Sequence, residues 1–137
     1  MPKTKHRVIV DTNLWISFLL TKNAIKLDKL VADDELVLLF SQELLDEFVE
    51  VARRPKFKKY FSLSNLEDLL TELRSKAEFI DVTSKVDVCQ DSKDNFLLAL
   101  SVDGNATHLI TGDKDLLDIA TFGNTTILTI AEYLATQ

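Results

Sequence analysis

The stretch VIVDTNLWISFLL, residues 8–20, places an acid between two apolar runs. Three β-branched apolar residues lead into Asp11, and a second apolar run follows Thr12 and Asn13. The first run is typical of a strand buried on both faces, and the second has the length of a helix. Asp11 therefore stands where a buried strand ends and a helix begins, either as a helix cap or as a functional group.

The same alternation continues along the chain. Five short apolar runs are predicted as strands, at residues 7–10, 36–40, 78–82, 107–111 and 125–129. Strands that alternate with helices and are apolar on both faces indicate an α/β fold, with a mostly parallel sheet covered by helices on both sides. In such sheets the ligand crevice lies beyond the carboxyl ends of the strands, where Asp11 stands.

Helices are predicted between these strands from apolar periodicity and cap residues. The first occupies residues 13–32, in two pieces that meet near Thr21–Asn23. Capping boxes are predicted at Ser64 with Glu67 and at Thr129 with Glu132. The remaining helices follow Ser41 to about Arg54, then cover residues 65–77, 93–103 after caps at Asp91 and Ser92, 114–120, and the C-terminal segment.

Composition narrows the function classes. The 137 residues suffice for one domain, and no apolar stretch has the length of a membrane span. One cysteine excludes an intrachain disulfide, and the start resembles no signal peptide, so we expect a cytoplasmic protein. With two histidines and no zinc pattern, any metal site must use oxygen ligands.

The net charge of −6 by itself disfavours nucleic-acid binding, but two basic stretches stand out. KTKHR covers residues 3–7, and RRPKFKK covers residues 53–59. The second stretch is a candidate for RNA-phosphate contacts, and its alternative is a solvated turn after a helix. Its five cations are Arg53, Arg54, Lys56, Lys58 and Lys59.

Four acids form the candidate site: Asp11, Glu47, Asp94 and Asp113. Asp11 and Asp113 follow strands, and Asp94 falls in the first turn of a helix. Glu47 lies about 100° from the centre of the apolar stripe on its helix, so it can lean inward, whereas Glu43, Asp46 and Glu50 lie further round and face solvent. Taken singly, each acid has a structural alternative as a helix cap or a surface residue.

Carboxylates about 4 Å apart repel by roughly 4 kcal/mol at an effective dielectric constant near 20, so such a cluster takes up protons or binds cations. Hard divalent cations prefer oxygen ligands, and a bound Mg²⁺ accepts phosphate oxygens of a substrate. Such an ion can activate water for phosphodiester hydrolysis.

At these residues the chain resembles PIN-domain (PilT N-terminal) nucleases. The similarity rests on VIVDTNLWIS with Asp11, SQELLDEFVEVARRPKF with Glu47, DSKDNFLLAL with Asp94 and TGDKDLL with Asp113, in family order over about residues 7–128. It is closest to small stand-alone members described as toxins of toxin–antitoxin pairs.

The resemblance implies one PIN-like domain over residues 1–137, a Rossmann-like α/β/α sandwich of four to five strands, and an Mg²⁺- or Mn²⁺-dependent endoribonuclease. One or two ions would be held by the four acids, which would also be the catalytic residues. Supporting roles are expected for Asn13, Thr111, Asp115 and Asp91. The expected partners are an RNA substrate, an antitoxin protein and a second copy of the chain in a homodimer, with no membrane.

Three other functions compete with this interpretation. A haloacid-dehalogenase-type phosphatase would need a second Asp two residues after Asp11, where Asn13 stands. A phosphoacceptor receiver domain would need an adjacent acidic pair after the first strand and a Lys after the fifth. A non-catalytic RNA- or protein-binding module on the same fold is disfavoured by the intact acid set, since the fold alone does not decide function.

Overall fold

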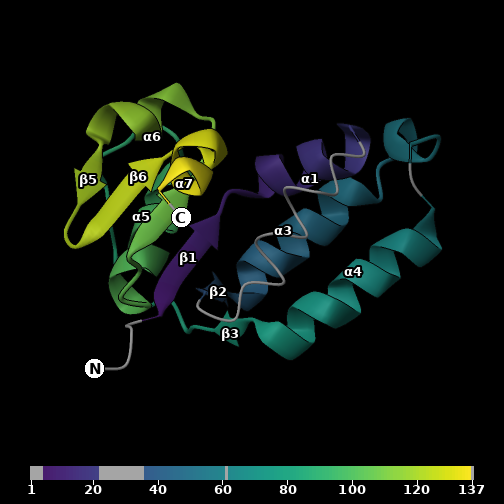
Figure 1. Cartoon of the computed structure of the whole chain (residues 1–137), viewed down its shortest axis with the longest axis horizontal. Coiled ribbons are helices and arrows are strands. Elements are labelled where there is room, and N and C mark those ends of the chain that lie inside the picture. Colours follow the sequence, from purple (N-terminus) through teal and green to yellow (C-terminus); the bar gives the residue numbers. More distant parts are fainter. Residues whose placement is uncertain (1–4, 22–35, 61, 137) are drawn as a thin grey trace.

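The computed structural model describes residues 5–21, 36–60 and 62–136, and its centre is a sheet in the order β3-β2-β1-β4-β6-β5 (Figure 1). Five strands run parallel, and β5 pairs antiparallel with β6. The bounds are β1 His6–Val10, β2 Leu36–Phe40, β3 Glu78–Phe79, β4 His108–Ile110, β5 Thr121–Phe122 and β6 Thr125–Leu128. The predicted parallel α/β sheet is confirmed.

Helices flank this sheet in two groups (Figure 1). α1, α3 and α4 lie together beyond β1 and β2, whereas α5, α6 and α7 gather around β4, β5 and β6. None of the helices in the described ranges is long and apolar enough to cross a membrane. Their bounds are α1 Thr12–Thr21, α3 Gln42–Ala52, the 3₁₀ helix η1 Pro55–Phe57, α4 Leu63–Lys76, α5 Ser92–Asp103, α6 Lys114–Ile119 and α7 Ile130–Ala135.

The core forms where the apolar strands meet the helices. Val8, Ile9 and Val10 of β1 are buried, as expected for a strand covered on both faces. Trp15 of α1 is fully buried, with its ring centroid 6.1 Å from that of Phe40 and 6.3 Å from that of Phe48. Trp15 is therefore a core residue that fixes α1 against β2 and α3.

Several predicted boundaries differ from the structure. The sheet has one strand more than the four to five expected, because the two residues of β5 are too few to show a periodic pattern. The strand predicted at residues 78–82 ends at Phe79, because its partner β2 ends at Phe40 and Phe40 pairs with Phe79. The part of the first predicted helix beyond Thr21 falls on residues 22–35, outside the described residues.

Helix caps decide where most helices begin. Ser41, Asp91 and Thr129 cap α3, α5 and α7 as predicted, the last in a full capping box. The capping box at Ser64 and Glu67 is wrong. The hydroxyl of Ser62 accepts the backbone N–H of Asn65, so α4 begins at Leu63 and Ser64 lies inside its first turn.

The topology creates a crevice between β1 and β4. From β1 the chain builds the sheet outward through β2 and β3, and it then crosses to β4 on the other side of β1. Connections on the two sides of this point diverge, which leaves a ligand crevice at the carboxyl ends of the two strands. Val10 pairs with Ile110 at these ends, directly before Asp11 and Thr111.

The Ser41 cap orients the helix that carries Glu47. The Ser41 side chain is fully buried, and its Oγ accepts the backbone N–H of Leu44 at 3.0 Å. We expect Ser41→Ala to lower the free energy of unfolding by about 1–2 kcal/mol, because a buried N–H loses its acceptor. Urea unfolding measures the change. Ser62→Ala, at the exposed cap of α4, is the control, with an expected loss of about 0.5 kcal/mol because water replaces its hydroxyl; equal losses at the two caps would contradict the role of burial.

Candidate active site

Thr111 connects two of the candidate acids. The backbone N–H of Asp11 donates to the carbonyl oxygen of Ile110 at 3.0 Å, which fixes the ends of β1 and β4 side by side. The Thr111 hydroxyl donates to Asp11 Oδ2 at 2.9 Å and accepts the backbone N–H of Asp113 at 3.0 Å. Thr111 has no exposed surface, so this bridge is shielded from water. Residues 100 positions apart in the chain are thereby held in one hydrogen-bonded unit.

Three acids also cap helices. Asp11 Oδ1 accepts the backbone N–H of Asn13, Asp91 accepts that of Lys93, and Asp113 accepts that of Asp115. Negative charge at a helix N-terminus is favourable, so the starts of α1, α5 and α6 partly offset the repulsion among the acids. The cap alternative is therefore true of Asp11, Asp91 and Asp113. It does not compete with a ligand role, because a carboxylate oxygen that accepts one hydrogen bond has a lone pair left.

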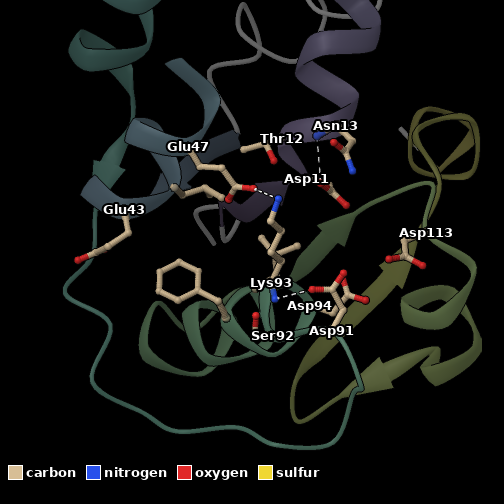
Figure 2. Close-up of a pocket in the computed structure, with 13 residues that line it drawn as sticks. Asp11, Thr12, Asn13, Glu43, Glu47, Asp91, Ser92, Lys93, Asp94 and Asp113 are labelled. Carbon is tan, nitrogen blue, oxygen red and sulfur yellow. Dashed lines mark hydrogen bonds and ion pairs between the residues drawn. The ribbon is translucent and has the colours of Figure 1, made fainter. Parts of the chain in front are cut away.

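All four predicted acids line one pocket of about 320 Å³ (Figure 2). Asp11 comes from the end of β1, Glu47 from α3, Asp94 from α5 and Asp113 from the turn after β4. Asn13 and Asp91 line the same pocket, whereas Thr111 lies beneath it. The other lining residues are Thr12, Glu43, Leu44, Ser92, Lys93, Phe96 and Leu97.

Glu43 departs from its prediction. It is exposed, as expected of the solvated face of α3, yet it also lines the pocket. Its position in the first turn of α3 puts it at the edge of the crevice. The sequence analysis used only the angle of each residue around the helix axis, which does not show where along the helix the crevice lies. Glu47 is half-buried and lies deeper in the pocket, as its angle to the apolar stripe indicated.

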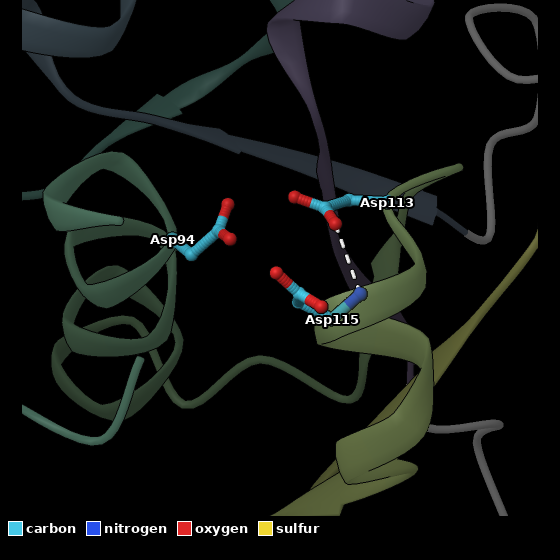
Figure 3. A group of neighbouring side chains, drawn as sticks. All are labelled: Asp94, Asp113 and Asp115. Atoms are coloured by element: carbon cyan, nitrogen blue, oxygen red, sulfur yellow. Dashed lines mark hydrogen bonds between the residues drawn. The ribbon is translucent and has the colours of Figure 1, made fainter. Parts of the chain in front are cut away.

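Asp115 lies closer to the other acids than a supporting role requires. One carboxylate oxygen from each of Asp94, Asp113 and Asp115 lies within 4.8 Å of the other two (Figure 3). Asp94 is buried, Asp113 is half-buried and Asp115 is exposed. The three side chains face a common point between the start of α5 and the start of α6 (Figure 3). This geometry could hold a cation directly, with Asp115 as a ligand from the solvent side.

Burial and mutual repulsion shift the acids toward their protonated forms. Burial, a hydrogen bond with Asp113 and the negative charges of Asp113, Asp91 and Asp11 raise the pKa of Asp94 to about 7. Burial also raises the pKa of Asp11, against the hydrogen bonds from Asn13 and Thr111 and with the charges of Asp113 and Glu47. A site that holds protons this strongly near neutral pH has a deficit of positive charge, which a divalent cation would fill.

Glu47 already has a cationic partner. Lys93 Nζ lies 2.9 Å from Glu47 Oε1 and joins α5 to α3 across the pocket (Figure 2). The hydrogen bond and the negative charge of Glu47 raise the pKa of Lys93, so the ammonium stays charged. No pattern in the sequence singled out Lys93, because its partner Glu47 lies on another helix, 46 residues earlier in the chain.

Asn95 is a second residue that the sequence analysis missed. Its Oδ1 accepts the backbone N–H groups of Val88 and Cys89, and its Nδ2 donates to the carbonyl oxygen of Cys89 at 2.9 Å. Asn95 thereby fastens the loop that leads into Asp91. The Asn directly after Asp94 in DSKDN was the available signal, since Asn side chains commonly hold nearby backbone.

The basic segment lies outside the pocket lining. Its five cations are exposed: Lys56 lies within η1, and the other four lie on either side of this helix, which follows the end of α3. Lys56 and Lys59 lie over the rings of Phe57 and Tyr60, at 5.1 and 5.2 Å from the ring centroids. Of the other basic stretch, Arg7 pairs with Glu78 and donates to Gly104, so it serves the fold.

Both histidines lie at the amino ends of the central strands, away from the acids. His6 and His108 begin β1 and β4, with ring centroids 4.6 Å apart, whereas the acids follow the other ends of these strands. The pocket therefore offers oxygen ligands and no imidazole. Oxygen donors that include several carboxylates suit Mg²⁺ or Mn²⁺, so the side chains present fit a hard divalent cation.

Comparison with known proteins identifies this arrangement. The model of the PIN domain matches residues 7–115, a range that contains all four acids. The chain belongs to the PIN-domain family. This PIN domain is 33% identical to the uncharacterized protein MJ1680 of Methanocaldococcus jannaschii, over 122 residues that cover 87% of this chain and 78% of that protein. No solved structure matches. PIN domains are nuclease domains that act on nucleic acids with divalent metal ions, so the family and the acidic pocket point to the same chemistry.

The raised pKa of Asp94 predicts a pH-dependent effect of its removal. The folded-state pKa exceeds the unfolded value of 3.8, so the protonated form stabilises the fold at low pH and this stabilisation is lost as the pH rises towards about 7. In metal-free protein, Asp94→Asn should raise the unfolding free energy relative to wild type by on the order of 1 kcal/mol more at about pH 8 than at about pH 5.5.

Urea unfolding in the presence of a chelator measures this difference. The exposed Asp118, on α6 and outside the pocket lining, provides the control Asp118→Asn, which should give the same difference from wild type at both pH values. An Asp94→Asn effect that does not change with pH would show that Asp94 ionises freely in the folded protein.

The hydrogen bonds of the Thr111 hydroxyl predict that removing this hydroxyl lowers the free energy of unfolding, even when the shape of the side chain is kept. Thr111→Val keeps the shape but leaves a buried carboxylate oxygen of Asp11 and the N–H of Asp113 without their partner. We expect a loss of about 1–3 kcal/mol in unfolding free energy, and a smaller loss for Thr111→Ser, which retains the hydroxyl. Urea unfolding at neutral pH compares the two, and a valine variant as stable as the serine variant would contradict the bridge.

Proposed function

We propose that this PIN domain is a metal-dependent endoribonuclease that hydrolyses RNA phosphodiester bonds. The observation that carries the proposal is the convergence of Asp11, Glu47, Asp94 and Asp113 on one pocket from four separate parts of the chain. Capping explains why Asp11 and Asp113 stand at helix starts, but it does not explain why a buried Asp94 and a half-buried Glu47 face them.

The chain's own residues would divide the work. Asp94 and Asp113 would hold one Mg²⁺ or Mn²⁺ with Asp115 on the exposed side, and Asp11 and Glu47 would complete this site or hold a second ion. When bound, such an ion activates water and stabilises the leaving oxygen. Thr111 fixes the Asp11 carboxylate, Asn13 supports it through its backbone N–H, and Asp91 holds the start of α5, on which Asp94 stands.

The basic segment would supply phosphate contacts away from the scissile bond. Its five exposed cations follow the helix that carries Glu47, and two of them stand over aromatic rings. Exposed Arg and Lys side chains of this kind bind backbone phosphates and position a strand without reading its sequence. We propose that the residues that contact phosphates are Arg53, Arg54, Lys56, Lys58 and Lys59.

The proposed domain extends beyond the family match. β6 lies after residue 115, yet it pairs with β4 at the centre of the sheet, so the fold is incomplete without it. We propose that residues 1–137 form one PIN domain. The toxin role, the antitoxin partner and the homodimer stay predictions that rest on the family resemblance.

Paired titration and cleavage measurements test the proposed activity. We expect metal-stripped protein to bind Mn²⁺ saturably by calorimetry, and to cleave single-stranded RNA only when Mg²⁺ or Mn²⁺ is added. Glu47→Gln and Asp94→Asn should each lower the cleavage rate by about 100-fold or more, because ligand carboxylates are removed. Glu50→Gln is the matched control: it lies on the same helix, is exposed, lies outside the pocket lining and should cleave as wild type does.

Other outcomes would favour the competing functions. RNA binding without cleavage in any divalent metal would favour a non-catalytic binding module. Release of phosphate from a small phosphomonoester, with intact RNA, would favour a metal-dependent phosphatase.

A further inference from the structure

Lys93 is the cation of an otherwise acidic pocket. Of the thirteen described residues that line it, six are acids and Lys93 alone is basic. Its side chain reaches from α5 across the pocket to Glu47 on α3 (Figure 2). The cap of α5 uses the backbone N–H of Lys93 but not its ammonium group, and Lys93 does not belong to the hydrophobic core.

The stability of α5 does not explain a lysine at this position. Lys93 is the second residue of the helix, where the exposed backbone N–H groups favour anions and disfavour cations. The nearby acids do explain it, because one positive charge reduces the repulsion among six carboxylates. Lys93 therefore belongs to the electrostatics of the pocket and not to those of its own helix.

The ion pair between Lys93 and Glu47 is weak enough to be broken by a competing ligand. The Lys93 side chain is 66% exposed and that of Glu47 is 29% exposed, with 2.9 Å between Nζ and Oε1. Exposed ion pairs contribute little to stability, and the lysine ammonium stands on a flexible four-carbon stem. A competing cation at Glu47 can therefore displace the ammonium while the backbone of α5 stays in place.

A nucleic-acid strand must bring its own negative charge into this pocket. Each phosphodiester group carries one negative charge, and the lining offers one basic side chain to receive it. The basic segment after α3 lies outside the lining, so Lys93 is the described basic residue that lines the pocket beside the acids.

We propose that Lys93 exchanges between two partners: the Glu47 carboxylate in the metal-free protein, and a phosphate of the bound RNA once Glu47 takes up a metal ion. The inference rests on the proposed metal-dependent cleavage and adds a residue to it. Lys93 thus competes with the metal ion for Glu47 and assists the substrate, so its removal affects the two ligands in opposite directions.

Metal binding in the absence of RNA tests the first half. Calorimetry with Mn²⁺ should show about 2–5-fold tighter binding to Lys93→Met than to wild type, the range that loss of an exposed ion pair supports. In a Glu47→Gln background the same change should tighten Mn²⁺ binding less than in wild type, because the direct competition for the Glu47 carboxylate is gone and only the more distant acids still respond to the lost charge. Lys76→Met is the matched control, because it removes an equally charged group from an exposed pair with Glu72 on α4 and should leave Mn²⁺ affinity unchanged.

RNA kinetics test the second half. With saturating Mn²⁺, we expect Lys93→Met to raise the KM for a short single-stranded RNA by about 5–10-fold, because a charge-assisted contact to phosphate is lost. Lys93→Arg, which keeps the charge, and Lys76→Met should stay within about 2-fold of wild type. A lysine with only a structural role would not tighten metal binding and weaken RNA binding together.

The failures are distinguishable. Suppose that wild type binds Mn²⁺ and cleaves RNA. A Lys93→Met variant with unchanged or lower Mn²⁺ affinity, or with an unchanged KM, would then overturn the exchange and leave the proposed nuclease function intact. Wild type that binds no Mn²⁺, with or without RNA, would overturn the proposed function and the exchange with it.

Discussion

The parallel pairing of β1 with β4 is the constraint on which the site depends. Val10 lies beside Ile110, so the residues that follow each strand emerge at the same edge of the sheet. Asp11 and Thr111 meet there directly, and Asp113 follows within hydrogen-bonding reach of the same hydroxyl. A slip of one residue in this register would turn Thr111 away from Asp11 and break the bridge. The sheet therefore sets the geometry of the acids, and the helices complete it.

The second consequence of this arrangement is an excess of negative charge in a small volume. Three features of the fold reduce the repulsion. Backbone N–H groups at the starts of α1, α5 and α6 donate to Asp11, Asp91 and Asp113, the Thr111 hydroxyl donates to Asp11, and the Lys93 ammonium pairs with Glu47. The compensation is incomplete, because the pKa of Asp94 remains near 7. An incompletely compensated anionic pocket is what a site for a divalent cation requires.

Sequence reasoning predicted the central strands and most helices but not the extent of the strands at the edges of the sheet. The apolar runs around Asp11 and the caps at Ser41 and Asp91 identified the main strands and helices, since local composition dictates these elements. It missed β5 and extended β3 too far, because the lengths of edge strands depend on where their partners end. It also chose Ser64 over Ser62 at α4, where two similar side chains compete for one helix start.

The sequence alone suffices to infer the fold class and the nuclease family and to single out four candidate acids, because strand periodicity, helix caps and motif order are properties of short local stretches. The arrangement of charges around these acids emerges only when the chain is folded. The tertiary structure places Asp115 beside Asp94 and Asp113, sets Lys93 against Glu47, puts Thr111 beneath Asp11 and buries Trp15 in the core. These relations join elements that are distant in the chain, and their distances follow from strand register and helix packing, which no local pattern specifies.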